Sequence, residues 1–236
     1  LQEKLHRVFH QYGFEDIETP TFEYFEVFSK EVGTIPSREL YKFFDREGNT
    51  LVLRPDFTPS VSRACATYFN PEKEVVSLCY TGNTFINNSS FRGRLKETTQ
   101  MGVERMGDDS PEADAEILAM TVECLLATGL TEFQVSVGQV DYYKAIFAQT
   151  GMSQEEEEEL RELISQKNYF GVEELVKNKN MDKSLARVLS QLPQMFGSTE
   201  VLEKAKSLTD NPQALKAVAR LEEIYELLKV YGYEKY

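Results

Sequence analysis

The sequence has few of the residues that build disulfide frameworks and metal sites. It holds only three cysteines, Cys65, Cys79 and Cys124, which lie far apart and form no Cys-x-x-Cys pair. An odd count without paired spacing predicts free thiols. The two histidines, His6 and His10, have a spacing that can chelate a metal on a helix, but no carboxylate motif accompanies them. We therefore expect helix-surface histidines and neither a bound metal nor a cofactor.

Long apolar runs and the common catalytic signatures are also absent. No run approaches the roughly 20 apolar residues of a membrane span, and the first residues, "LQEKLHRVFHQYGF", contain no hydrophobic signal core. We expect a cytoplasmic protein that makes no membrane contact. The Gly-x-Ser-x-Gly, Gly-x-Gly-x-x-Gly, His-Glu-x-x-His and P-loop motifs do not occur. Their absence argues against the common hydrolases, dinucleotide enzymes, metalloproteases and nucleotide kinases.

Positive charge is scarce relative to negative charge. Lys and Arg total 26 against 39 Asp and Glu, a formal net charge of -13. This field repels phosphate backbones, so we expect no nucleic-acid partner. The 236 residues can bury one large core, with or without an inserted module. The chain begins with Leu1, which shares a helical face with Leu5 and Val8, so we expect residues to precede it.

Residues 1–142 alternate between strand and helix signals, which predicts an α+β core. The first helix is expected to end at Gly13, and "DIETPTFEYFEVF" to be extended. The runs "ELYKFFD" and "TLVLRPD" predict a hairpin. Thr58 is expected to cap a helix with Pro59 in its first turn and with one buried face, formed by Val61, Ala64, Cys65, Tyr68 and Phe69.

The second half of this core continues the pattern. Residues 75–85 and 94–106 predict two long antiparallel strands joined by "NNSSFRG". Ser110 starts a helix, and "EFQVSVGQ" predicts a further strand. The inward face of that helix is expected to carry Ile117, Leu118, Val122, Leu125 and Leu126.

Residues 143–236 read instead as short amphipathic helices, a helical insertion or second module. The run of five glutamates from Glu155 to Glu159 lies in the first turns of a helix that begins near Ser153. Negative charge at that end complements the helix dipole, so we interpret it as a solvated helix face and not as an acidic binding tract.

Polar residues gather on the predicted strands around two stretches. In "LVLRPDFTPS", Arg54 and Asp56 are expected on one side of a strand, with Thr58 just beyond. In "RLKETTQMGVE", one face carries Arg94, Lys96, Thr98, Gln100, Gly102 and Glu104. Carboxylates and an amide in this arrangement match an ammonium or imidazolium ligand. Spacing alone leaves an exposed polar strand face equally open.

The order of these segments carries a resemblance. "YGFEDIETPTFEYFEVFSKEVG", "ELYKFFDREGNTLVLRPDFTPSVSRACATY" and "LCYTGNTF" through "GRLKETTQMGVERMG", followed by "EADAEIL", resemble the catalytic domain of histidyl-tRNA synthetases over roughly residues 1 to 140. The resemblance implies a class II synthetase-like antiparallel sheet flanked by helices, with residues 80–107 as the hairpin called motif 2.

Two departures from the synthetase pattern bear on function. The family's motif 2 begins with Phe-Arg, whose arginine grips the α-phosphate of ATP, but this chain has Phe85 followed by Ile86. An aliphatic side chain supplies neither charge nor hydrogen bonds to that phosphate. The synthetase "RPEGT" is replaced by "RPDFT". This version is similar to the histidyl-tRNA synthetase-like regulatory subunits of ATP phosphoribosyltransferase, which lack aminoacylation and pair with a short catalytic subunit.

This second resemblance implies a histidine sensor. Asp56, Thr58 and Gln100 are expected at the α-amino end of L-histidine and Glu104 at its imidazole. Arg94 is expected at the ligand carboxylate or in ordering the loop. The implied partners are the short catalytic subunit, which holds the catalytic residues, and a second copy of the chain in a dimer.

Two other functions stay open. A histidyl-tRNA synthetase fragment would be an enzyme, and Ile86 argues against it. A structural subunit that binds no small molecule is the other alternative. The chain ends "LLKVYGYEKY", before any segment like the family's "Tyr-Tyr-Thr-Gly" or motif 3, so we expect the site to lack one wall.

Overall fold

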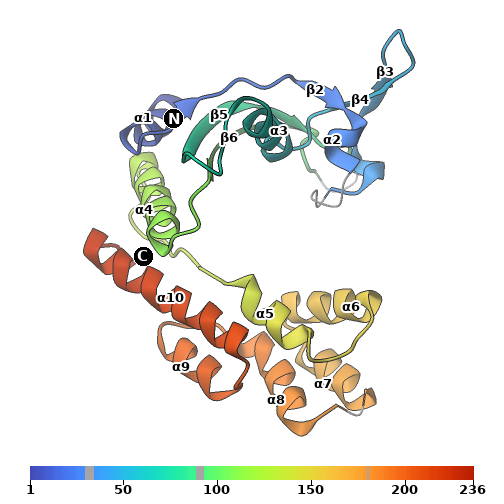
Figure 1. Cartoon of the computed structure of the whole chain (residues 1–236), viewed down its shortest axis with the longest axis vertical. Helices are drawn as coiled ribbons and strands as arrows, with labels where there is room; N and C mark the ends of the chain where they lie inside the picture. Colours follow the sequence, from blue (N-terminus) through green and yellow to red (C-terminus); the bar gives the residue numbers. More distant parts are fainter. Residues whose placement is uncertain (30–34, 89–92, 180) are drawn as a thin grey trace. The chain divides into compact units, whose positions relative to one another are not determined.

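The computed structural model describes residues 1–29, 35–88, 93–179 and 181–236 of the chain. The chain separates into two compact units: residues 1–110 with 120–131, and residues 111–119 with 132–236. The first holds both sheets and the second is helical (Figure 1). Helix α4, Pro111–Thr128, contributes to both units. A functional boundary at residues 142 and 143 stays a prediction.

The larger sheet of the first unit has the order β1-β5-β6. Strand β1, Glu15–Asp16, pairs in parallel with β5, Val76–Phe85, which pairs antiparallel with β6, Glu97–Met106. The predicted long hairpin is thus confirmed, although its second strand begins three residues later than the predicted Arg94. Helix α1, Gln2–Gln11, precedes the sheet and is followed by Gly13 at a φ of 78°, as the sequence predicts.

The smaller sheet, of order β2-β4-β3, contains the predicted hairpin. Strands β3, Lys42–Phe44, and β4, Thr50–Leu53, pair antiparallel, and β2, Phe22–Tyr24, adds to β4. The turn between β3 and β4 is closed by Asp45, whose Oδ1 accepts the backbone N–H groups of Glu47 and Asn49. Extension of the whole segment 16–28 is wrong at its end, since the chain forms α2, Phe25–Ser29. A short helix, η1, covers Ser37–Glu39.

Helix α3, Thr58–Tyr68, packs on β5 (Figure 1). Its Val61 and Cys65 join a buried cluster with Val76 and Leu78 of β5. The prediction that Thr58 caps this helix is wrong. Phe57 occupies the cap position without a side-chain hydrogen bond, so the Thr58 hydroxyl is available to a residue of another strand. Tyr68 is also not inward, with 79% of its surface exposed, because the apolar contact of α3 ends at Cys65.

The second unit confirms the predicted run of helices. Fully buried Ile146, Leu160, Val172 and Leu189 lie in its core. Ser153 and Glu156 form a capping box at the start of α6, so the glutamate run lies in the first turns as predicted. The helices are α5 Val140–Phe147, α6 Gln154–Ser165, α7 Tyr169–Asn178, α8 Lys183–Gln191, η3 Leu192–Gln194, α9 Glu200–Ser207 and α10 Pro212–Tyr231.

Two predictions between the sheet and these helices have mixed outcomes. On α4, Val122 is buried, whereas the other four predicted inward residues are half-buried. The strand predicted from "EFQVSVGQ" is absent, because no described strand pairs with residues 132–139. The Val135 N–H donates instead to the Tyr236 carbonyl at 2.7 Å. No helix in the described ranges is long and apolar enough to cross a membrane.

Candidate ligand-binding site

The register of the β5-β6 hairpin gathers polar side chains on one face of the larger sheet. Glu104 lies opposite Leu78, Gly102 opposite Tyr80 and Gln100 opposite Gly82. Alternate residues of a strand share a face, so these six positions lie together. Leu78 and Tyr80 contact residues of α3, so this is the face that α3 covers. The face is therefore reachable from the start of α3, where Thr58 lies.

Glu104 is the half-buried carboxylate of this face. The Thr58 hydroxyl donates to Glu104 Oε1 at 2.6 Å, joining α3 to β6. Burial raises the Glu104 pKa above its usual value, and the negative charge of Asp56 adds to the rise. Hydrogen bonds from Thr58 and Tyr80 offset part of it. A carboxylate in this setting gains from any ligand that brings a positive charge or another N–H donor.

Tyr80 reaches Glu104 from β5 and is the site residue that sequence reasoning missed. Its ring is 5% exposed and stacks on Phe57, with the ring centroids 4.3 Å apart and the planes 8° apart. Burial, and next the charge of Glu104, raise its pKa to about 12, so its phenol stays protonated at neutral pH.

Gly102 makes room for this tyrosine. A Cβ placed on Gly102 would lie 2.5 Å from Tyr80 Cζ, which is closer than carbon atoms approach. A glycine paired with an aromatic residue across a hairpin is the sequence signal that could have found Tyr80.

Asp56 and Gln100 complete the cluster. Gln100 Nε2 lies 3.5 Å from Asp56 Oδ1, at the limit of a hydrogen bond. Asp56 Oδ1 also accepts the Phe57 N–H at 2.7 Å, which fixes the carboxylate at the entrance to α3. The structure therefore brings together four of the five predicted binding residues. Two carboxylates, a hydroxyl and an amide in one place suit a cationic ligand with several N–H donors.

Arg94 is the predicted binding residue that is not brought to this cluster. It lies before the first residue of β6, so it does not share the strand face of Gln100 and Glu104. Its side chain is exposed, and within the described residues no hydrogen bond or ion pair joins it to the other four. The prediction of a continuous strand from Arg94 is wrong because the ladder of β5 ends at Phe85 and Glu97.

Arg54 has a structural role that the alternating pattern did not predict. Strand β4 ends at Leu53, so Arg54 and Asp56 do not lie on one side of a strand. Arg54 is 7% exposed; its Nε donates to the Asn83 carbonyl at 2.8 Å and its Nη1 to the Thr19 carbonyl at 2.9 Å. Its guanidinium also lies over the Phe57 ring, 4.0 Å from the centroid. Arg54 thus fixes the ring against which Tyr80 stacks.

Ile86 follows the last residue of β5. Its N–H donates to the Lys96 carbonyl at 2.9 Å, which extends the hairpin by one bond, and its side chain is half-buried. An aliphatic side chain at this place offers nothing to a phosphate group.

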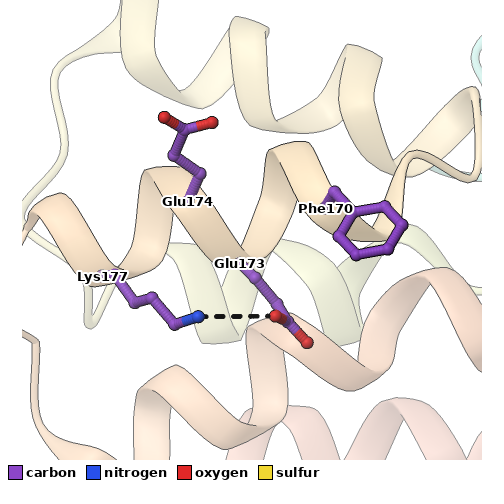
Figure 2. A pocket seen from close by; sticks show the side chains of 4 residues that line it. All are labelled: Phe170, Glu173, Glu174 and Lys177. Carbon is purple, nitrogen blue, oxygen red and sulfur yellow. Dashed lines mark ion pairs between the residues drawn. The ribbon is translucent and has the colours of Figure 1, made fainter.

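A shallow hollow on α7 does not share the features of the sheet site. It is lined by Phe170, Glu173, Glu174 and Lys177, all exposed and all from one helix (Figure 2). Lys177 Nζ lies 3.6 Å from Glu173 Oε2, one helical turn away. An exposed pair of this kind contributes little free energy, because solvent screens it. The sheet site, with half-buried groups that hydrogen-bond one another, is the better candidate.

The fold and the hairpin together define a class II aminoacyl-tRNA synthetase-like protein. A family model for histidyl-tRNA synthetase matches residues 1–235, so the chain belongs to the histidyl-tRNA synthetase family. The class II fold and the family resemblance predicted from the sequence are thereby confirmed.

Two curated relatives and two solved structures refine this likeness. Proteins named ATP phosphoribosyltransferase regulatory subunit from Acetivibrio thermocellus and Clostridium acetobutylicum are 39% and 37% identical over 100% and 95% of this chain. A Bacillus halodurans C structure, named ATP phosphoribosyltransferase regulatory subunit/histidyl-tRNA synthetase, aligns with a TM-score of 0.89 at 31% identity and covers all of this chain and 61% of its own. The Nostoc sp. PCC 7120 histidyl-tRNA synthetase shares the fold, with a TM-score of 0.75 at 19% identity, over 98% of this chain and 54% of its own. This chain spans 56% of the length of both curated relatives.

Proposed function

We propose that this chain is the synthetase-like part of a regulatory subunit of ATP phosphoribosyltransferase in histidine biosynthesis. The observation that carries the proposal has two parts: the residues expected to bind an amino acid are assembled, and the position expected to bind a phosphate carries no cationic side chain. The cluster of Asp56, Thr58, Gln100 and Glu104 is assembled and hydrogen-bonded, whereas Ile86 stands where a synthetase needs a cation. A site of this kind binds an amino acid without activating it.

L-Histidine is the proposed ligand. Its α-ammonium group suits Asp56, Thr58 and the Gln100 carbonyl oxygen, which can all accept hydrogen bonds. Its imidazole suits Glu104, because a carboxylate accepts a ring N–H or pairs with an imidazolium. Arg94 stays a weaker proposal, for the ligand carboxylate or for the order of the hairpin loop.

The proposed protein is not itself catalytic. The relatives' name, regulatory subunit, supports a non-catalytic role, and we propose that catalysis belongs to a short catalytic subunit that needs this chain for activity. Histidine would favour an assembly with low phosphoribosyltransferase activity. Feedback inhibition would then arise from a coupling free energy between histidine binding on this chain and the active state of the partner. A dimer of this protein, within a cytoplasmic hetero-oligomer, completes the proposal, with residues 1–142 as the sensing core and 143–236 as the helical module.

Calorimetric titration of the full-length protein with L-histidine tests the ligand directly. Binding should be saturable, and Glu104→Ala should weaken it by about 1.5–3 kcal/mol, roughly 10- to 150-fold in Kd, because a charged hydrogen-bond acceptor is lost. Glu97→Ala is the matched control, because Glu97 is an exposed carboxylate on the same strand and outside the cluster. Equal loss in both variants would contradict the assignment of Glu104.

Mixing the protein with a short catalytic subunit from the same source tests the regulation. Phosphoribosyltransferase activity should appear on mixing and fall as histidine is added, and Glu104→Ala should relieve the inhibition while keeping the activation. If activation occurs but histidine has no effect, the chain is a structural subunit and the sensing proposal fails.

Aminoacylation is the second candidate, because the matched family carries the synthetase name and the Bacillus halodurans C structure carries it beside the regulatory-subunit name. It predicts histidine-dependent exchange of pyrophosphate into ATP by this protein alone. The loss of a positioned cation at Ile86 should make this rate negligible, since one such group contributes several kcal/mol to transition-state stabilisation. Measurable exchange would establish a synthetase and refute the regulatory proposal.

A further inference from the structure

The opposite face of the larger sheet carries a second polar cluster that the proposed function does not use. Its members are His6 and His10 of α1, Asp16 of β1 and Cys79 of β5. One donor atom from each lies within 4.8 Å of all the others. The sequence offered two histidines without a carboxylate. The fold supplies both a carboxylate and a thiol.

The parallel pairing of β1 with β5 builds this cluster. Asp16 and Cys79 lie directly opposite each other in the register, and Cys79 Sγ is 3.5 Å from Asp16 Oδ1. His6 and His10, one turn apart on α1, approach the same carboxylate. His6 Nε2 lies 2.6 Å from Oδ1 and His10 Nε2 lies 3.0 Å from Oδ2. Three elements thus direct four metal-ligating groups to one point.

We propose that these four residues bind a divalent transition-metal ion of the zinc class. Two imidazole nitrogens, one carboxylate oxygen and one thiolate are ligands that zinc takes in tetrahedral sites. Adjacent ligand atoms of such a tetrahedron are about 3.3–3.6 Å apart, given zinc–nitrogen and zinc–sulfur distances of about 2.0 and 2.3 Å. The 3.5 Å between Cys79 Sγ and Asp16 Oδ1 already lies in this range. The distances of 2.6 and 3.0 Å from Asp16 to the two imidazole nitrogens need to lengthen by less than about 1 Å, which small side-chain rotations can supply.

The charge and burial of the cluster agree with a metal. The ring centroids of His6 and His10 are 4.2 Å apart, so two positively charged rings would repel each other over one carboxylate. A metal ion instead satisfies both ring nitrogens and the carboxylate together. Cys79 is fully buried beneath them, while Asp16 and the imidazoles are partly exposed, which leaves the ion a route from solvent.

Metal binding must remove the thiol proton. Burial raises the Cys79 pKa to about 12, with Asp16 adding to the rise, so the thiol is protonated at neutral pH. The ion would replace this proton: the S–H bond breaks, a metal–thiolate bond forms and one proton passes to water. Affinity should therefore increase with pH and each bound ion should release a proton.

Cobalt(II) titration of the chelator-stripped full-length protein tests this site, without histidine present because free histidine itself binds cobalt. One equivalent should produce the intense visible bands of tetrahedral cobalt and a near-ultraviolet thiolate-to-cobalt band. Zinc should displace the cobalt and raise the unfolding temperature. Cys79→Ser should abolish the thiolate band, and His10→Gln should weaken cobalt binding about tenfold or more.

Cys65→Ser is the matched control, because Cys65 is equally buried but lies on α3 outside the cluster. It should leave the cobalt spectrum unchanged. Because His10 is exposed, the His10→Gln variant keeps the test decisive even if the Cys79 variant does not fold. A spectrum without a thiolate band, or one that survives both Cys79→Ser and His10→Gln, would show that the cluster is held by hydrogen bonds alone.

Discussion

Cys79 and Tyr80 are neighbours on β5, yet they belong to two different polar clusters because their side chains leave the sheet on opposite faces. On the Cys79 face, Asp16 is 58% exposed and its pKa is lowered, chiefly by the hydrogen bond from His6. On the Tyr80 face, the Glu104 pKa is raised, chiefly by burial. Two carboxylates beside one strand are thus shifted in opposite directions.

The difference shows that the groups around a carboxylate decide the direction of its pKa shift more than its place on the fold does. Asp16 meets two imidazoles and water, so its charged form is favoured. Glu104 is half-buried beside a phenol, a hydroxyl and a second carboxylate, Asp56, so its charged form is disfavoured, and a bound cation would favour it. The first setting suits a small inorganic ion and the second an organic cation.

The largest expected effect comes from removing the ring that supports the Tyr80 face. Phe57 is 1% exposed, stacks on Tyr80 and lies under Arg54. Phe57→Ala should lower the free energy of unfolding by about 3–5 kcal/mol in urea denaturation, because it leaves a cavity. Phe44→Ala, on an exposed ring of β3, is the control and should be close to neutral.

The Phe57→Ala variant and its Phe44→Ala control also test whether the two faces of the sheet bind their ligands independently. In folded Phe57→Ala protein, histidine binding should fall while cobalt binding at Cys79 persists. Loss of both together would show that the faces are not independent.

A smaller effect is expected from filling the space at Gly102. Gly102→Ala should destabilise the protein by about 1–3 kcal/mol, since its Cβ collides with the Tyr80 ring. Gly138→Ala is the matched control, because nothing lies within 4 Å of a Cβ there and its φ is not positive. The double variant Gly102→Ala/Tyr80→Leu should lose less free energy of unfolding than the two single variants added together. An additive result would mean that the ring does not depend on Gly102.

Local pattern predicted those elements whose partners are close in sequence. The β3–β4 hairpin and the helix that begins near Ser153 follow from residues a few positions apart, and the β5–β6 hairpin joins two consecutive strands. The predicted strand at 132–139 failed, because alternation favours a strand only where another strand is present to pair with it. The prediction that Tyr68 is buried was wrong for a similar reason, since α3 extends past the surface that buries its first turns.

The site was predictable only in part for the same reason. The hydrogen bond between Thr58 and Glu104 joins residues 46 positions apart. The strand pattern left a binding site and an exposed polar face equally open, and the family resemblance favoured the site. The prediction that Arg54 and Asp56 lie on one side of a strand was wrong because β4 ends at Leu53. The neighbours of His6 and His10 depend on the register between β1 and β5. Strand β1 has only two residues, too few to show an alternating pattern in the sequence.

The smallest expected effect is a pH dependence that isolates Glu104. Its folded-state pKa is raised from the usual 4.5, so between these values the folded protein binds a proton that the unfolded chain has released. Glu104 therefore favours folding most below pH 4.5, and this contribution is lost as the pH rises through the raised value. Other carboxylates, among them Asp16 and Asp45, have lowered pKa values and shift stability the opposite way.

The comparison of wild type with Glu104→Gln removes those opposing contributions, because they are common to both proteins. A glutamine keeps an acceptor for the Thr58 hydroxyl but does not titrate. The free energy of unfolding of wild type minus that of Glu104→Gln, measured by urea denaturation without histidine, should decrease as the pH rises from below 4.5 toward neutrality. A flat or rising difference would show that folding does not raise the Glu104 pKa, and the contrast with the lowered pKa of Asp16 would disappear. Saturating histidine should flatten the decrease, since a bound cation offsets the burial that causes it.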